Sequence, residues 1–183
     1  MRYIFVITVL YSTLFARFQS DLKILNQMYE NNSFKKACRF ASNKIMGYKK
    51  NEKFVSLYAF SCLKSDNIDK LASATILLKH STEARANSVY FSTILLQKKL
   101  LLHAMIDNFD IEQLQLPSTD YILSKVFDLF MKDEKKEDKI HEFIDSNNPN
   151  EKYRLFIKNE NENKKIIIEH YLNNNLIKTH KYW

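Results

Sequence analysis

Apolar side chains recur at intervals of three and four residues along most of this chain, a spacing that predicts amphipathic α-helices. Short polar stretches interrupt the pattern and predict turns between the helices. The stretch 82–107 is apolar on more than one side, so we expect it, as one helix or two, near the centre of the fold. The expected helices cover residues 21–30, 33–46, 52–64, 68–80, 82–107 and 120–132, with a helical continuation to about residue 145.

The hydrophobic period changes after the helix-breaking residues 147–150. Apolar and polar residues then alternate, and the asparagines at 173–175 predict a hairpin turn because this residue tolerates positive φ. Residues 152–183 are therefore expected to form a three-stranded antiparallel β-meander. The predicted fold class is mainly α, with antiparallel helical hairpins in a domain over residues 17–146 and the meander as a small C-terminal appendage.

The first 16 residues have the three regions of a secretory signal peptide. Arg2 is a short basic start, residues 3–15 carry no charge, and the small residue Ala16 precedes Arg17. This apolar run is shorter than the roughly 20 residues that a membrane-spanning helix needs. We expect cleavage after Ala16 and a periplasmic or secreted protein with no transmembrane span. The alternatives are an uncleaved N-terminal anchor and a buried first helix or strand.

An offset of 34 residues superimposes two successive helical pairs. Tyr-Glu-Asn-Asn-Ser-Phe-Lys-Lys-Ala at 29–37 then lies over Leu-Lys-Ser-Asp-Asn-Ile-Asp-Lys-Leu at 63–71, with Phe34 over Ile68. This part of the chain, about residues 20–80, resembles the tetratricopeptide repeat family, whose period is 34 residues. The resemblance implies stacked helical hairpins with a concave peptide-binding face. The hairpins are expected either to stack as an open superhelix or to close into a bundle.

The composition excludes several classes of enzyme. Gly47 is the only glycine, and there are two prolines. Phosphate-binding loops, dinucleotide-binding turns and serine nucleophile elbows need more glycines, since the backbone must approach the ligand closely. We also find no catalytic constellation and no metal-ligand motif, so we expect a protein that is not an enzyme and has no cofactor or metal. An enzyme with scattered catalytic residues is the remaining alternative.

Positive charge is concentrated in the predicted helical hairpins. Residues 17–107 hold 15 Lys and Arg against 7 Asp and Glu. Such a basic body favours an anionic partner, which is a lipid surface, an acidic glycan or an acidic protein; the alternative is an ordinary solvated surface. Export makes nucleic acid an unexpected partner. The candidate basic binding face consists of Lys35, Lys36, Arg39, Lys49, Lys50 and Lys53.

Two pairs of residues are further candidates for a specific role. Cys38 and Cys62 lie on helices that are expected to be neighbours, so they either form a disulfide or are two small buried side chains. Tyr182 and Trp183 end the last predicted strand. This aromatic pair is either a docking tail for a partner or packs back onto the domain.

Together these features favour a non-catalytic interaction or scaffold protein of a cell-envelope assembly. The assembly would be a machine such as a flagellar motor or a secretion system, and the expected partner state is a hetero-oligomer with envelope proteins. The second hypothesis is a module that binds an anionic glycan or lipid surface through its basic helical face.

Overall fold

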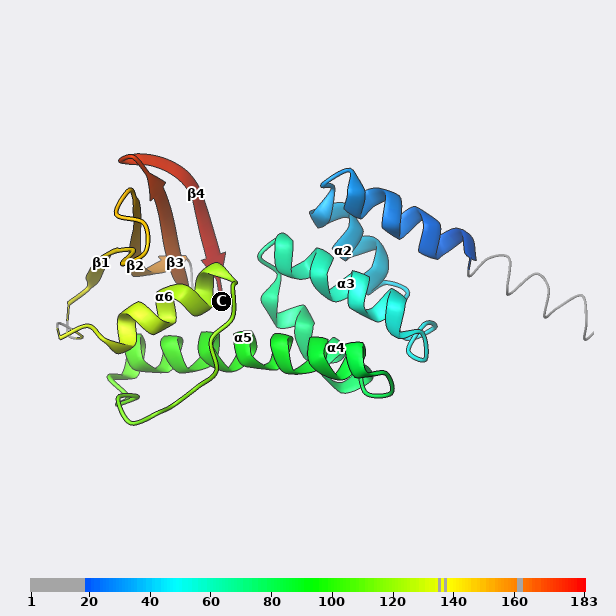
Figure 1. The fold of residues 1–183 in the computed structure, drawn as a ribbon, viewed down its shortest axis with the longest axis horizontal. Coiled ribbons are helices and arrows are strands. Elements are labelled where there is room, and N and C mark those ends of the chain that lie inside the picture. Colours follow the sequence, from blue (N-terminus) through cyan, green and yellow to red (C-terminus); the bar gives the residue numbers. More distant parts are fainter. Residues whose placement is uncertain (1–18, 135, 137, 161–162) are drawn as a thin grey trace, which may run out of the picture.

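The computed structural model describes residues 19–134, 136, 138–160 and 163–183. Over these residues, six helices are followed by a four-stranded antiparallel sheet, so the fold is mixed, α then β (Figure 1). The predicted signal peptide, residues 1–16, lies outside the described residues. No helix of the described part has both the length and the apolar character that crossing a membrane requires.

The helices follow the predicted segments closely. Neighbours in the chain pack side by side: α2 contacts α3, α3 contacts α4, α4 contacts α5, and α5 contacts α6. The predicted helix over 68–80 begins as a 3₁₀ turn, and the stretch 82–107 is one unbroken helix. The bounds are a first helix over 19–30, α2 Phe34–Ser42, α3 Glu52–Lys64, η1 Ile68–Lys70, α4 Leu71–Leu77, α5 Thr82–Asp107 and α6 Ile122–Met131.

The first two helical hairpins turn in the same way. Asn32 and Asp66, which are 34 residues apart, both have left-handed backbones with φ of 54° and 61°. The amide of the next residue, Ser33 or Asn67, donates to the carbonyl oxygen five residues earlier, at 2.9 Å in both turns. A left-handed residue followed by this hydrogen bond is the Schellman arrangement that ends helices. The 34-residue offset in the sequence is therefore also an offset in backbone geometry.

A disulfide joins the two hairpins. Cys38 on α2 and Cys62 on α3 are bonded, with their Cα atoms 4.7 Å apart. Both residues are buried in the core. Disulfides persist in oxidising compartments, so this bond is consistent with a location outside the cytoplasm.

Removing the disulfide tests how far it stabilises the fold. The double variant Cys38→Ala/Cys62→Ala should lose about 3 kcal/mol of unfolding free energy, because its unfolded chain is no longer closed into a loop. Urea denaturation with and without reductant measures this. Reductant should lower the stability of the wild type to that of the variant and leave the variant unchanged; equal stability of the two oxidised proteins would contradict the prediction.

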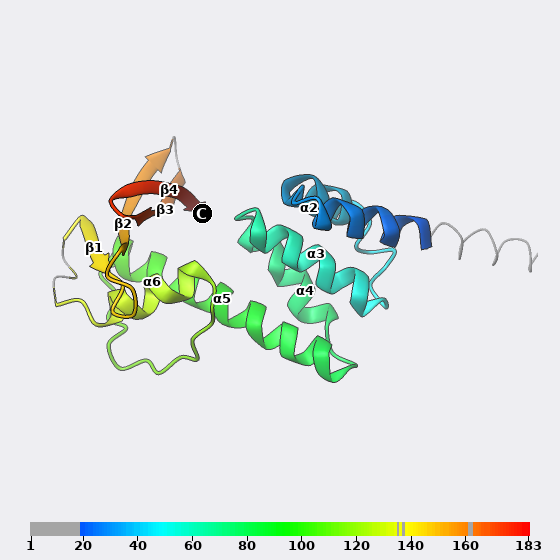
Figure 2. The ribbon, with the colours of Figure 1, turned by 45° about the horizontal axis from the view of Figure 1, so that its top comes forward.

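Helix α5 runs along the whole molecule (Figures 1 and 2). Its 26 residues extend over about 39 Å at 1.5 Å per residue. Its first half packs on α4 and its second half lies beside α6. Its buried side chains include Phe91, Ile94 and Leu101. The helix therefore lies at the centre of the fold, as its apolar composition predicts.

A carboxylate on α3 holds the beginning of α5. Glu52 accepts hydrogen bonds from the backbone amides of Lys79, His80 and Ser81, at 2.9, 2.6 and 2.9 Å. These bonds, with the one from His80 foremost, lower the pKa of Glu52 to about 2. The Ser81 hydroxyl in turn accepts from the amide of Ala84 and caps the helix.

The Glu52 contacts predict a specific dependence of stability on pH. Because folding lowers this pKa from 4.5 to about 2, the ionised carboxylate stabilises the fold above pH 4.5, and that contribution disappears as the pH falls toward 2. The melting temperature of Glu52→Gln should lie below that of the wild type at neutral pH, and the two should converge in acid.

The matched control for this experiment is Glu83→Gln, in the first turn of α5, which removes a carboxylate without removing those three bonds. A gap between wild type and Glu52→Gln that persists unchanged at pH 2 would refute the assignment.

The C-terminal sheet has four strands rather than the predicted three. The order is β1-β2-β3-β4, with antiparallel neighbours throughout. The left-handed residues Asn173 and Asn174 form the turn between the last two strands, as predicted. The strands are β1 Ile140–Ile144, β2 Glu151–Glu160, β3 Asn163–Leu172 and β4 Asn175–Tyr182.

The additional strand corrects the prediction of a helix up to residue 145. Ile140, Phe143 and Ile144 fit a helical face by their spacing, but His141 and Phe143 also alternate with exposed neighbours, as a strand requires. Pairing with β2 decides between the two patterns, since β1 lies antiparallel along it. The helical part therefore ends with α6, and the sheet begins at Ile140 instead of at residue 152.

One face of the sheet joins the helical core. Tyr153, Leu155, Ile166 and Ile168 are buried on that face and belong to the same apolar cluster as the helices. The core is thus continuous from the first hairpin to the sheet. This continuity fixes the inner face of the sheet opposite the tips of the helical hairpins.

Candidate functional site

An open groove of about 970 Å³ lies along α2, between the first hairpin and the second. Apolar side chains of Met28, Phe34 and Phe40 form part of its wall. They are partly buried, so they offer apolar surface without leaving the core. The groove also has a polar lining of four cations and three amides, namely Lys35, Lys36, Arg39, Lys70, Asn32, Asn43 and Asn67.

The cations of this groove carry positive charge that the fold does not neutralise. Lys35, Lys36 and Arg39 are exposed on α2, and no carboxylate among the described residues forms an ion pair with them. Lys70 donates to the Ser42 hydroxyl at 3.1 Å. None of the described residues that line the groove is acidic. The groove therefore suits an anionic segment that also carries apolar side chains.

The structure divides the predicted basic face. Lys35, Lys36 and Arg39 line the groove, whereas Lys49, Lys50 and Lys53 do not. These last three lie in the turn after α2 and at the start of α3, and they are exposed there.

Lys70 belongs to the groove and was not among the predicted residues. The 34-residue offset places it at the position of Lys36 in the preceding hairpin. The repeat could therefore have indicated it.

A second hollow of about 580 Å³ separates the hairpin tips from the sheet. Aromatic side chains from three helical segments, Tyr29, Phe60 and Tyr90, form part of its lining. Positive and negative groups balance here, unlike in the groove along α2. The charged residues are Lys64, Lys125, Lys178, Asp66, Asp120 and Glu151.

Asp66 connects the second hairpin to the sheet across this hollow. Its carboxylate lies 2.8 Å from the imidazole of His180 on β4 and accepts from the hydroxyl of Tyr121 at 3.0 Å. The hydroxyls of Tyr121 and Tyr182 lie 3.0 Å apart. Burial, followed by the charge of Asp66, raises the pKa of Tyr121 well above its ordinary range. Both partners of Asp66 are therefore neutral or cationic donors, which makes the contact a stable join.

Lys125 on α6 organises the opposite side of the hollow. Its ammonium contacts Asp145 and lies 3.5 Å from Glu151. Burial alone would lower the pKa of Lys125, but the bond to Asp145 outweighs it and the pKa is raised. The hydroxyl of Tyr153 donates to Glu151 and lowers the pKa of that carboxyl, while burial raises the pKa of Tyr153 to about 12.

These pKa shifts all move groups away from neutrality. The shifted tyrosines keep their protons and the shifted carboxylates remain ionised at pH 7. Acid–base catalysis needs a group with a pKa close to the working pH. The shifted groups of this hollow are therefore suited to joining the sheet to the helices.

The sequence did not indicate this hollow. His180 and Asp66 are 114 residues apart, and neither belongs to a recognisable motif. Their meeting depends on how the sheet docks against the hairpin tips.

The two residues of the predicted docking tail have different environments. Tyr182 is only 1% exposed and packs against Tyr121, so it is not available to a partner, and the prediction is wrong for this residue. Its position on the inner face of the sheet, opposite Ile166, explains the burial. Trp183 is 65% exposed.

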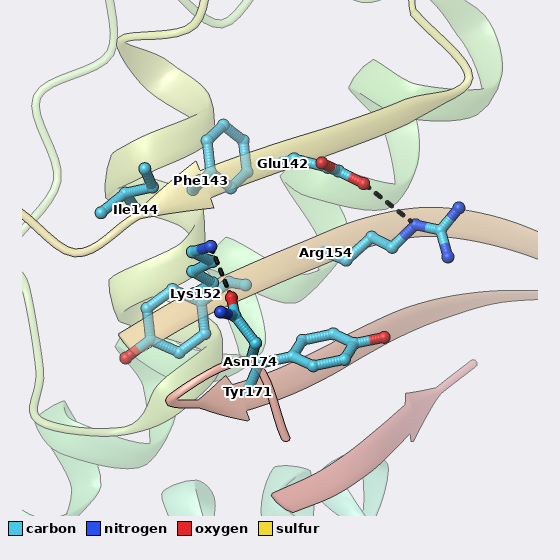
Figure 3. Close-up of a pocket in the computed structure, with 8 residues that line it drawn as sticks. Glu142, Phe143, Ile144, Lys152, Arg154, Tyr171 and Asn174 are labelled. Carbon is cyan, nitrogen blue, oxygen red and sulfur yellow. Dashed lines mark hydrogen bonds and ion pairs between the residues drawn. The ribbon is translucent and has the colours of Figure 1, made fainter. Parts of the chain in front are cut away.

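A third hollow, of about 460 Å³, lies over β1, β2 and the turn before β4 (Figure 3). Its polar side chains pair with one another: Arg154 lies 3.5 Å from Glu142, and Lys152 donates to Asn174 at 2.6 Å. These pairs neutralise the charges that a ligand would contact. The groove along α2 is therefore the stronger candidate for a binding site.

Among the described residues, no three His, Cys, Asp or Glu side chains gather as a metal site would require. The chain matches no protein-family model, and no match was found among the curated proteins or the solved structures. The fold itself defines the class: a helical part of paired hairpins followed by a four-stranded antiparallel meander.

Replacing Asp66 by asparagine tests the join between hairpin and sheet. Asn32 shows that asparagine accepts the same left-handed backbone, so Asp66→Asn should keep the turn and lose the charge that faces His180 and Lys178. We expect the free energy of unfolding to fall by about 1 to 3 kcal/mol. Hydrogen exchange should accelerate in β4 more than in α2.

The matched control is Asn32→Asp in the equivalent turn of the first hairpin, which should leave exchange in β4 unchanged. If Asp66→Asn and Asn32→Asp altered β4 equally, the proposed role of Asp66 would be incorrect.

Proposed function

We propose that this chain is an exported, non-catalytic interaction protein that serves as a scaffold in a cell-envelope assembly such as a flagellar motor or a secretion system. The observation that carries the proposal is the groove along α2, which combines unpaired cations with apolar side chains. The disulfide between Cys38 and Cys62 lies directly beside it, so the groove has a rigid wall. A rigid groove loses little conformational entropy when a partner binds.

We infer that residues 20–80 are a tetratricopeptide-like pair of hairpins. The repeated turn geometry at Asn32 and Asp66 supports this inference. Repeats of this kind bury their apolar faces against neighbouring repeats, and two alone are insufficient. Here α5 packs on α4 and takes the place of the next repeat.

A periplasmic or secreted location is part of the proposal. Two independent features support it: the signal-like residues 1–16 and the disulfide. After cleavage at Ala16 the chain would reach its partner as a free domain.

A second function is favoured by the charge of the same groove. Lys35, Lys36, Arg39 and Lys70 would also attract an anionic glycan or a lipid surface. Such binding would rest on charge alone, so it would be weakened strongly by salt. Protein docking would also depend on the apolar wall formed by Phe34 and Phe40.

Cross-linking in the native cells, followed by purification and mass spectrometry, tests the scaffold proposal. We expect one or two envelope proteins in near-equal amount with the wild type. The groove variant Lys35→Glu/Arg39→Glu should recover at least about tenfold less of them, as the loss of several charge contacts implies.

The matched control is Lys49→Glu/Lys50→Glu, which makes the same change of charge outside the groove and should recover the partners as the wild type does. Recovery of the chain with no envelope protein would contradict the scaffold proposal. Wild-type binding to heparin or to vesicles of anionic lipid would then support the second function.

A further inference from the structure

The loop that follows α5 has the chemistry that the groove along α2 lacks. Asp107, Asp110 and Glu112 are exposed carboxylates within six residues of chain. Phe109 and Leu114 are exposed apolar side chains in the same segment, with Phe109 45% exposed. An acidic segment with apolar side chains is the kind of ligand that the cations and the apolar wall of the groove would bind.

The fold holds this loop in a presented form. Ile111 is buried and anchors the segment to the core. The ring of Phe109 stacks on the imidazole of His103, with ring centres 4.3 Å apart and planes 9° apart. Asp110 accepts a hydrogen bond from the amide of Glu112 at 2.8 Å. The exposed side chains are thus displayed by a segment that is already ordered, which reduces the entropy lost on binding.

The loop and the groove lie in different parts of the molecule. The loop leaves the end of α5 beside α6 and the sheet, whereas α2 belongs to the hairpins over the other half of α5 (Figures 1 and 2). One copy therefore presents both complementary surfaces without joining them to each other. Two different surfaces that complement each other between copies give a head-to-tail contact, which can propagate as an open chain.

We propose that the groove along α2 binds the acidic loop at residues 107–114 of a second copy of this chain. The inference rests on the proposed function, because it takes the groove to be a protein-docking site. Carboxylates of Asp107 and Asp110 would face Lys35, Lys36 and Arg39, and Phe109 would enter the apolar part of the groove. The groove of the terminal copy stays free for the envelope partner.

The size of the contact determines its strength. A groove of about 970 Å³ has room for several side chains of a peptide segment, since ligand pockets of folded proteins reach about this volume. One such segment buries less than the roughly 1,200 Å² at the lower end of stable interfaces. Self-association is therefore weak, and it rises with protein concentration and falls with salt.

Sedimentation velocity of the purified chain over a range of concentrations tests the proposal. The wild type should shift toward dimers and larger species as concentration rises, with association at least about tenfold weaker near 0.5 M salt than near 0.05 M. The groove variant Lys35→Glu/Arg39→Glu and the loop variant Phe109→Ser/Asp110→Asn should each remain monomeric. Asparagine keeps the oxygen that accepts from the Glu112 amide, so the loop retains its turn.

Mixing the two monomeric variants supplies the decisive measurement. The groove variant keeps an intact loop and the loop variant keeps an intact groove, so an equal mixture should form a one-to-one dimer that cannot grow further. The variant Lys49→Glu/Lys50→Glu, with its charge change outside the groove, should associate as the wild type does. Near-ultraviolet circular dichroism establishes that each variant is folded.

Two results would overturn the inference: a wild type that is monomeric at every concentration, or a mixture of the two variants that forms no dimer. A monomeric wild type that nevertheless recovers envelope proteins through the groove in cells would leave the scaffold function standing and reject self-association. A self-associating chain that recovers no envelope protein would reject the scaffold function instead.

Discussion

Burial of α5 on two sides is the constraint on which the rest of this structure depends. The helical hairpins cover its first half, and α6 with the sheet beyond it covers the second, so each part has an apolar surface to fold against. Lys98 shows how strictly the helix is enclosed, because it is only 4% exposed and its ammonium is held by Asp69 at 2.6 Å. Glu52 fixes where the helix begins by accepting three backbone hydrogen bonds. The position of this one helix therefore sets the distance between hairpins and sheet.

The same turn serves two purposes in successive hairpins. Asn32 and Asp66 have the same left-handed backbone, and each ends its helix with the same hydrogen bonds. Asn32 lines the groove along α2, whereas the carboxylate of Asp66 meets His180 on the sheet. The change from amide to carboxylate converts a turn that faces a partner into one that binds the chain's own C-terminal strand.

The hollows of the molecule differ in how their charges are satisfied. Between hairpins and sheet, Lys125 meets Asp145 and Glu151, and Asp66 meets His180, so charge is neutralised internally. In the groove along α2, Lys35 and Arg39 face no carboxylate of the described chain. An unsatisfied charged lining attracts a partner, while a satisfied one holds a fold together. This difference makes the groove the candidate binding site even though the other hollow contains more titratable groups.

Local patterns in the sequence determined the helices, the 34-residue offset and the asparagine turn at residues 173–175, because spacing and backbone preference act over a few residues. They also brought Cys38 and Cys62 onto neighbouring helices. Tertiary structure alone decided that residues 140–144 form a strand, since helical and alternating spacing coincide there and pairing with β2 stabilises the second. It also decided the burial of Tyr182 and the contact between Asp66 and His180. These depend on side chains more than 50 residues apart, whose meeting no local pattern records.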